Sequence, residues 1–250
     1  RSFRPSVPPG WERANSSRVN PLARISATAS ASPSASAAVV LAGRSAEKLE
    51  AAAAGLRATD AEVHTVVCDV TDEAQVAAAC EQAAAVGRFT MVVANAGSGS
   101  AAPSHLTTLD DWNSVMATNL TGAFLTIKHS AVHLARAGGG AIVAISSIAA
   151  PRTHRYMTPY CVSKAGLEML VQQAADELGS VGIRANAVRP SLVPTDISAG
   201  LTGSPDIVAD YLDQMPLARL GTVDDIANAV RFLLGDESSW ITGQCISTDG

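Results

Sequence analysis

Tyr160 and Lys164 are the two residues whose types and spacing most directly indicate chemistry. They stand four positions apart in a stretch with helical periodicity, so both side chains leave one face of the helix and their polar ends can converge. A phenol has an ordinary pKa of about 10 and transfers protons poorly at neutral pH, but a nearby ammonium group favours the phenolate. The spacing therefore predicts a general acid/base. Chance is the alternative, because this spacing is frequent on helices.

Two further polar residues belong to the same candidate site. Ser147 lies 13 residues before Tyr160, directly after the apolar segment 141–145, and open α/β sheets bind their ligands at the carboxyl ends of strands. Asn119 lies inside the helical stretch 108–136, where Asn is a mediocre helix former, and could hold a water molecule that hydrates the Lys164 ammonium. A helix-capping or solvated amide is the alternative for Asn119.

Short apolar segments that alternate with longer helical ones must position these residues. The strands are expected at 39–43, 63–68, 91–94, 141–145, 183–188 and 244–247. The helices are expected at 46–58, 73–86, 108–136, 157–179 and 223–235. Continuously apolar strands between helices predict an α/β fold with a parallel sheet covered on both faces: three layers, doubly wound and Rossmann-like.

Composition and charge exclude several classes of function. The chain has 250 residues, 47% of them hydrophobic, and a formal net charge of −5, which argues against a nucleic-acid or anionic-membrane partner. No apolar segment approaches the roughly 18 to 20 residues that span a bilayer. The cysteines are single and lack the spacing of a zinc site or redox pair, so no metal is expected and the thiols are those of a cytoplasmic protein. They are Cys68, Cys80, Cys161 and Cys245.

The composition changes sharply after residue 38. Residues 1–38 are rich in Ser, Ala and Pro, and their only acidic residue is Glu12. This segment is predicted to be atypical and disordered, whereas residues 39–250 form the α/β domain.

Residues 39–250 resemble the short-chain dehydrogenase/reductase family. The resemblance rests on separate motifs that follow one another in the family's order and spacing. They are Ala94-Asn95-Ala96-Gly97, Asn119 in a Thr-Asn-Leu context, Ser147 with Tyr160 and Lys164, and the segments 183–190, 216–221 and 240–244.

The resemblance implies an oxidoreductase that transfers a hydride between a nicotinamide dinucleotide and a carbonyl or alcohol substrate. Tyr160 would be the acid/base and Ser147 would hydrogen-bond the reacting oxygen. Lys164 would hold the ribose hydroxyls and lower the pKa of Tyr160, and Asn119 would anchor a water molecule of the proton relay. The sequence is about equally similar to 3-oxoacyl-carrier-protein reductases and to sugar and steroid dehydrogenases. The helices at 108–136 and 157–179 imply a homotetramer or homodimer.

The cofactor is expected to be NADP, with NAD less favoured. Relatives that select NAD carry an Asp after the second strand, where this chain has Arg44, whose guanidinium suits a 2′-phosphate. An arginine that merely solvates a loop is the alternative. The resemblance implies further cofactor contacts from Asp69, Val70, Asn95, Ala96, Gly97, Tyr160, Lys164, Pro190, Val193 and Thr195.

The family's glycine-rich turn is missing. The family places backbone N–H groups of this turn against the pyrophosphate, but the corresponding positions hold Val19, Ala23 and Ile25. Three explanations stay open for residues 1–38: an organelle transit peptide, a natural extension, or a frameshifted gene. The last two give a second functional hypothesis, a non-catalytic or cofactor-defective oligomeric scaffold. Loss of the first strand would also expose backbone edges in both halves of the sheet.

Overall fold

The computed structural model describes residues 38–59 and 61–250. The predictions for residues 1–38, including the glycine-rich positions 19, 23 and 25, therefore lie outside the described residues except for Ala38. The strands are β1 (Val39–Gly43), β2 (Val63–Val67), β3 (Met91–Ala94), β4 (Gly140–Ile145), β5 (Ile183–Pro190) and β6 (Cys245–Thr248). The main helices are α1 (Ala46–Arg57), α2 (Glu73–Val86), α3 (Leu109–Met116), α4 (Gly122–Arg136), α5 (Thr158–Leu178), α6 (Ala199–Thr202), α7 (Pro205–Asp213) and α8 (Val223–Leu234).

All strand pairs in the described part of the chain are parallel, which confirms the predicted α/β fold class. β1 pairs with β2, and β3, β4, β5 and β6 form a second sheet in that order. Within residues 38–59 and 61–250, no strand joins β1 to β3. Helices link the two halves instead: α2 packs on α4, and Leu125 of α4 joins a buried cluster with Val66 of β2 and Val76 of α2.

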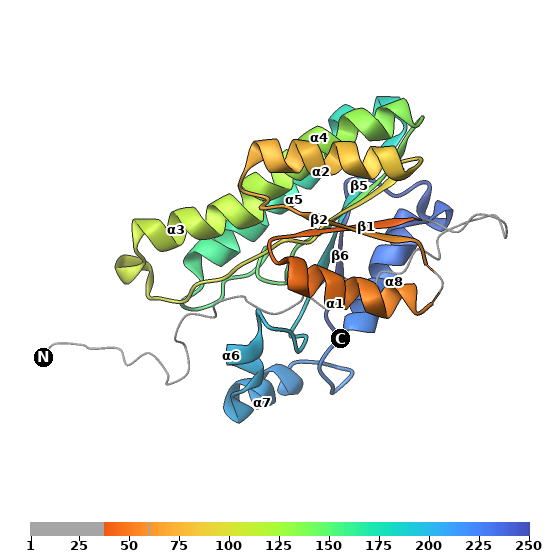
Figure 1. Ribbon diagram of the computed structural model, residues 1–250. Helices are drawn as coiled ribbons and strands as arrows, with labels where there is room; N and C mark the ends of the chain where they lie inside the picture. Colours follow the sequence, from red (N-terminus) through yellow and green to blue (C-terminus); the bar gives the residue numbers. More distant parts are fainter. Residues whose placement is uncertain (1–37, 60) are drawn as a thin grey trace, which may run out of the picture.

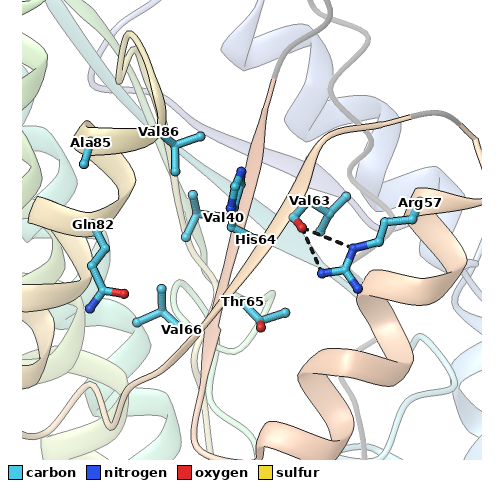
Figure 2. A pocket seen from close by; sticks show the side chains of 9 residues that line it. All are labelled: Val40, Arg57, Val63, His64, Thr65, Val66, Gln82, Ala85 and Val86. Carbon is cyan, nitrogen blue, oxygen red and sulfur yellow. Dashed lines mark hydrogen bonds between the residues drawn. The ribbon is translucent and has the colours of Figure 1, made fainter.

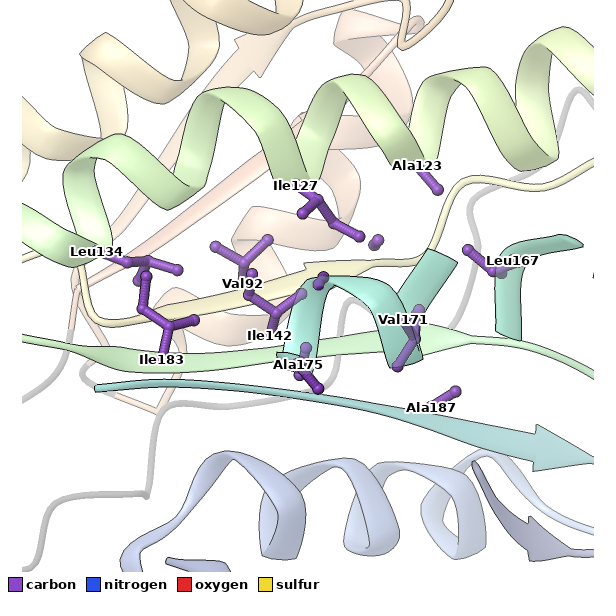
Figure 3. Packing of buried hydrophobic residues seen from close by; sticks show 14 residues of the cluster. Val92, Ala123, Ile127, Leu134, Ile142, Leu167, Val171, Ala175, Ile183 and Ala187 are labelled. Carbon is purple, nitrogen blue, oxygen red and sulfur yellow. The ribbon is translucent and has the colours of Figure 1, made fainter. Parts of the chain in front are cut away.

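Helices cover both faces of the sheets (Figure 1), with α2, α4 and α5 on one side and α1 and α8 on the other. Successive side chains of β4 point to opposite faces of the sheet, and helices cover both faces, which explains why the strand is apolar throughout. Ile142 and Ala144 pack in the cluster with α4 and α5, which Figure 3 shows around Ile127 and Val171. Ala141, Val143 and Ile145 pack instead with α8. A strand buried on both faces has no position that faces water, so apolar residues are favoured along its whole length.

The helical region expected at 108–136 is continuous from residue 109 to residue 136, but it contains a π-helical turn that the sequence did not predict. α3 ends at Met116, a π-helical turn spans Ala117–Thr121, and α4 begins at Gly122. Thr108 caps α3 by accepting a hydrogen bond from the backbone N–H of Asp111. A π-turn inserts one extra residue into a helix and frequently marks a functional site. Here it contains Asn119.

A hollow of about 480 Å³ lies beside β2, between residues of α1 and α2 (Figure 2). Two of its polar side chains have partners: Arg57 donates to the carbonyl of Val63 at 3.2 and 2.9 Å, and the ring of His64 contacts the Glu62 carboxylate at 2.9 Å. None of the predicted site residues lines this hollow.

The described residues contain no helix long and apolar enough to cross a bilayer. Within the same ranges, no group of three or more His, Cys, Asp or Glu side chains is arranged to hold a metal ion. All four cysteines are free thiols.

Candidate active site

Helix α5 delivers Tyr160 and Lys164 to the carboxyl end of β4. Pro159 stands in the first turn of the helix, where its missing N–H costs no intrahelical hydrogen bond. The side chain of Lys164 donates a 2.7 Å hydrogen bond to the carbonyl of Ile145, the last residue of β4. Ser147 follows two residues later, so the end of the strand and the start of the helix share one region.

A cavity of about 230 Å³ opens at this edge of the sheet. Its walls come from segments that follow β3, β4 and β5, from α5, and from the segment around α6 and α7. The sequence-predicted residues that line it are Asn95, Gly97, Ser147, Tyr160, Lys164, Pro190, Val193 and Thr195. Met157 is also part of the wall.

Tyr160 and Ser147 interact directly, and burial controls the phenol. Burial raises the pKa of Tyr160, because a phenolate is poorly solvated there, while a hydrogen bond with the Ser147 side chain acts in the opposite direction. The expected lowering of this pKa by Lys164 is therefore wrong as the net effect. The net rise favours the protonated form of the phenol.

Lys164 is a buried cation with only 3% of its surface exposed. Burial lowers the pKa of its ammonium group to about 8, since the charged form loses its hydration. Nζ lies 5.7 Å from the centre of the Tyr160 ring. At neutral pH the group still carries most of its charge, next to Tyr160.

Asn119 is fully buried and its amide is bonded to protein groups. Its Oδ1 accepts from the backbone N–H of Ser98 at 2.7 Å, and its Nδ2 donates to the Ser98 carbonyl at 2.9 Å and to Oγ of Ser163 at 3.0 Å. The side chain thus ties the π-turn to the segment after β3 and to α5. The sequence suggested that the amide of Asn119 binds a water molecule, but in the structure the amide is bonded to Ser98 and Ser163.

Gly97 lies beside both Asn119 and Lys164. A Cβ atom at Gly97 would lie 3.7 Å from Oδ1 of Asn119 and 3.7 Å from Nζ of Lys164. The absence of a side chain therefore leaves open the approach to Lys164.

The remaining predicted residues lie outside this cavity. Arg44 and Asp69 follow β1 and β2, and the Arg44 charge is one of the influences that lower the pKa of Asp69, after its hydrogen bonds with Thr71. Val70 packs on α4, where a Cβ atom at Gly122 would come within 2.7 Å of it. Ala96 is exposed between Asn95 and Gly97 and does not line the cavity.

Comparison with known proteins gives a consistent assignment. A family model described as enoyl-(acyl carrier protein) reductase matches residues 25–250. The chain is 37% identical over 215 residues to cis-4-hydroxycyclohexanecarboxylate dehydrogenase of Sinomonas cyclohexanicum, covering 85% of this chain and 86% of the relative. A solved short-chain type dehydrogenase/reductase from Mycobacterium ulcerans matches with a TM-score of 0.83 and 38% identity, over 85% of this chain and 79% of that chain.

The chain belongs to the short-chain dehydrogenase/reductase family. It is thus an oxidoreductase by family, and the family binds nicotinamide cofactors. A third relative is a gluconate 5-dehydrogenase from Burkholderia cenocepacia J2315, whose structure is a complex with NADP and tartrate. It matches with a TM-score of 0.82 and 30% identity, over 86% of this chain and 84% of that chain.

The cavity suits the polar groups of such a cofactor. Oδ1 of Asn95 is buried and has no hydrogen-bond partner among the described residues, although Asn95 lines the cavity. A buried amide oxygen of this kind is costly unless a ligand or water supplies a donor. A ribose hydroxyl is a donor of the right kind.

In this short-chain dehydrogenase/reductase, the sequence did not predict the role of a buried carboxylate, that of Glu168. It is hydrogen-bonded to Ser146, the residue before Ser147. Glu168 on α5 is 7% exposed and accepts hydrogen bonds from Ser146 and Arg189. A signal was available, because Glu168 stands four residues after Lys164 on the inner side of the helix, where an acid needs a partner. The cavity-lining residues His154 and Tyr211 carried no comparable signal.

Proposed function

We propose that this protein is an NADP(H)-dependent oxidoreductase that interconverts a carbonyl and an alcohol, with Tyr160 as the acid/base. The observation that carries the proposal is the meeting of Ser147, Tyr160 and Lys164 at one cavity, where the Ser147 side chain favours ionisation of the phenol. A nicotinamide dinucleotide, when bound, would supply or accept the hydride. The residues that would hold its ribose and nicotinamide are Asn95, Tyr160, Lys164, Pro190, Val193 and Thr195.

In the reducing direction, Tyr160 donates the proton that the carbonyl oxygen needs when it becomes a hydroxyl. The raised pKa of the buried phenol keeps that proton available at neutral pH. Lys164 then stabilises the phenolate that remains, because its ammonium charge is held nearby in a poorly hydrated site. Ser147 orients the phenol and is placed to hydrogen-bond the same substrate oxygen.

Arg44 supports the choice of NADP. It is exposed at the carboxyl end of β1, and its charge acts on Asp69 at the end of β2. A guanidinium at this edge of the sheet can pair with a 2′-phosphate, which NAD lacks. The NADP bound to the gluconate 5-dehydrogenase relative agrees with this choice.

We infer that the substrate is a small carbonyl or alcohol compound. The cavity is compact, and His154, Met157 and Tyr211 form its outer wall. The substrates named for the relatives, cis-4-hydroxycyclohexanecarboxylate and gluconate, are hydroxy acids, and 3-oxoacyl thioesters are a further class suggested by the sequence. These compounds form the first assay panel.

A homotetramer or homodimer is part of the proposal. α4 and α5 carry large apolar side chains on their outer surface, including Phe124 at 46%, Val132 at 50% and Met169 at 61% exposure. Apolar residues grouped on one surface commonly mark an interface. The cytoplasmic location expected from the sequence agrees with the four free cysteines. The scaffold hypothesis is not favoured, since the relatives include dehydrogenases and reductases and the side chains of Ser147, Tyr160 and Lys164 line one cavity.

Cofactor titration followed by a single substitution tests the proposal. We expect NADPH, and NADH more weakly, to raise the melting temperature of the full chain. Tyr160→Phe should keep NADPH binding and abolish turnover of the panel compounds. Tyr156→Phe is the matched control, because it removes the hydroxyl of a tyrosine that does not line the cavity. Unchanged turnover in Tyr160→Phe would refute the assigned role.

A further inference from the structure

Side chains from three successive turns of α5 contact residues 145–147 at the end of β4. They are Tyr160, Lys164 and Glu168. Tyr160 interacts with the side chain of Ser147, and Nζ of Lys164 donates to the carbonyl of Ile145 at 2.7 Å. Between them, Oγ of Ser146 donates to Oε1 of Glu168 at 2.8 Å. Residues spaced by four lie on one face of a helix, so these contacts form a single row.

The carboxylate of Glu168 also binds the end of the neighbouring strand. Nε and Nη2 of Arg189 each donate to it at 2.6 Å, one to each oxygen. Arg189 is the last residue before Pro190 in β5, and Pro190 lines the cavity. A paired, two-bond contact between guanidinium and carboxylate has a defined geometry as well as strength.

Glu168 and Ser146 are both buried, at 7% and 3% exposure. The carboxylate therefore has little competing water, and loss of either partner would leave a buried polar group unpaired. Because Ser146 precedes Ser147 in the chain, a shift of Ser146 moves the hydroxyl that contacts Tyr160. Backbone hydrogen bonds from Ser146 to Val188 and from Ile148 to Pro190 join the segment to β5.

We propose that Glu168 is a positioning residue of the reaction, which holds Ser146 and Arg189 so that Ser147 meets Tyr160 in the productive geometry. The inference rests on the proposed function of Ser147 and Tyr160. Glu168 itself lines no part of the cavity and touches no reacting atom.

The test measures ionisation of Tyr160 without substrate or cofactor. The ¹³Cζ resonance of labelled tyrosine is followed through the alkaline range in which circular dichroism shows an intact fold, and Tyr160→Phe assigns the signal among the three tyrosines. Lys164, Cys161 and Tyr211 are the titratable groups that face this phenol, and the variants leave them in place. The variants are Ser146→Ala, Glu168→Gln and Ser147→Ala.

We expect Ser146→Ala and Glu168→Gln to lower the ionisation constant of Tyr160 about fivefold, the equivalent of one hydrogen bond of about 1 kcal/mol. The direction is diagnostic for Glu168→Gln. Removing a negative charge and leaving Arg189 positive would by electrostatics alone make the phenol more acidic, not less. Turnover should fall about tenfold, with the KM for NADPH unchanged.

Glu177→Gln is the matched control, because Glu177 is an exposed acid on the same helix and accepts a 2.7 Å hydrogen bond from Gln173. It should change neither the ionisation constant nor turnover. The inference is overturned if Ser146→Ala leaves both at the wild-type value, even when Glu168→Gln lowers stability, because Glu168 would then serve the fold alone. If Ser147→Ala retains full turnover, the proposed function itself is wrong, which is a different result.

Discussion

The ammonium group of Lys164 and the carbonyl of Ile145 are joined by a 2.7 Å hydrogen bond that connects α5 to the last residue of β4. This bond supplies one partner to a cation whose exposure is only 3%. One carbonyl replaces only part of the hydration that an ammonium has in water, so the charged form remains disfavoured. The pKa of Lys164 accordingly falls from 10.5 to about 8.

The stability of the protein should therefore increase with pH through the Lys164 transition. Between about pH 8 and 10.5, the folded chain has lost this proton while the unfolded chain still binds it, so unfolding becomes less favourable as the pH rises. The gain approaches about 3 kcal/mol for the full shift. Urea unfolding at a series of pH values measures it. The gain should disappear in Lys164→Met and persist in Lys128→Met, whose lysine is exposed beside Glu73. Identical pH profiles for wild type and Lys164→Met would contradict the assignment.

Asn119 should stabilise the fold as well as the site. Asn119→Ala removes three hydrogen bonds and leaves the backbone N–H and carbonyl of Ser98 without these partners. We expect a loss of about 3 kcal/mol in the free energy of unfolding, because buried groups are left unpaired. Asn113→Ala, an exposed position on α3, should change stability by less than about 0.5 kcal/mol. Equal effects of the two substitutions in thermal unfolding would show that the buried amide of Asn119 contributes no more to stability than the exposed amide of Asn113.

Arg44 should decide between the two dinucleotides. Arg44→Ser is expected to weaken NADPH binding about tenfold or more and to leave NADH binding nearly unchanged, because only the 2′-phosphate loses its partner. Fluorescence titration with each cofactor gives the ratio. Arg88→Ser is the control: Arg88 is exposed and donates to the carbonyl of Ala137, away from the cavity. If Arg44→Ser weakened the binding of NADPH and NADH equally, Arg44 would not contribute to recognition of the 2′-phosphate.

Two helical glycines should respond to alanine with opposite signs. At Gly122, a Cβ atom would lie 2.7 Å from Cγ2 of Val70 and 3.2 Å from its carbonyl oxygen, and the branched valine cannot turn away freely. Gly122→Ala should therefore destabilise by about 1 to 3 kcal/mol. At Gly55 in α1 nothing lies within 4 Å, so Gly55→Ala should stabilise by up to about 1 kcal/mol. Melting temperatures that move in the same direction would refute this packing of Val70 on α4.

Local sequence was sufficient for most of the elements and for the catalytic pair. The unbroken apolar segments 91–94 and 141–145 correspond to strands because strands buried on both faces favour apolar side chains at every position. Tyr160 and Lys164 could be paired because helical spacing is a property of neighbouring residues. The π-turn at Ala117–Thr121 was not predicted, since its extra residue is held by the contacts of Asn119 with distant Ser98 and Ser163.

The sequence by itself determined the fold class, the strand ends at which the candidate site forms, and the residue proposed as the acid/base. The tertiary structure alone decided the electrostatics and the supporting contacts. Whether Tyr160 gains or loses acidity depends on how deeply it is buried, and Glu168 becomes part of the site only because β4, β5 and α5 meet there. Burial and contacts between residues far apart in the chain arise from packing, which spacing along the sequence does not encode.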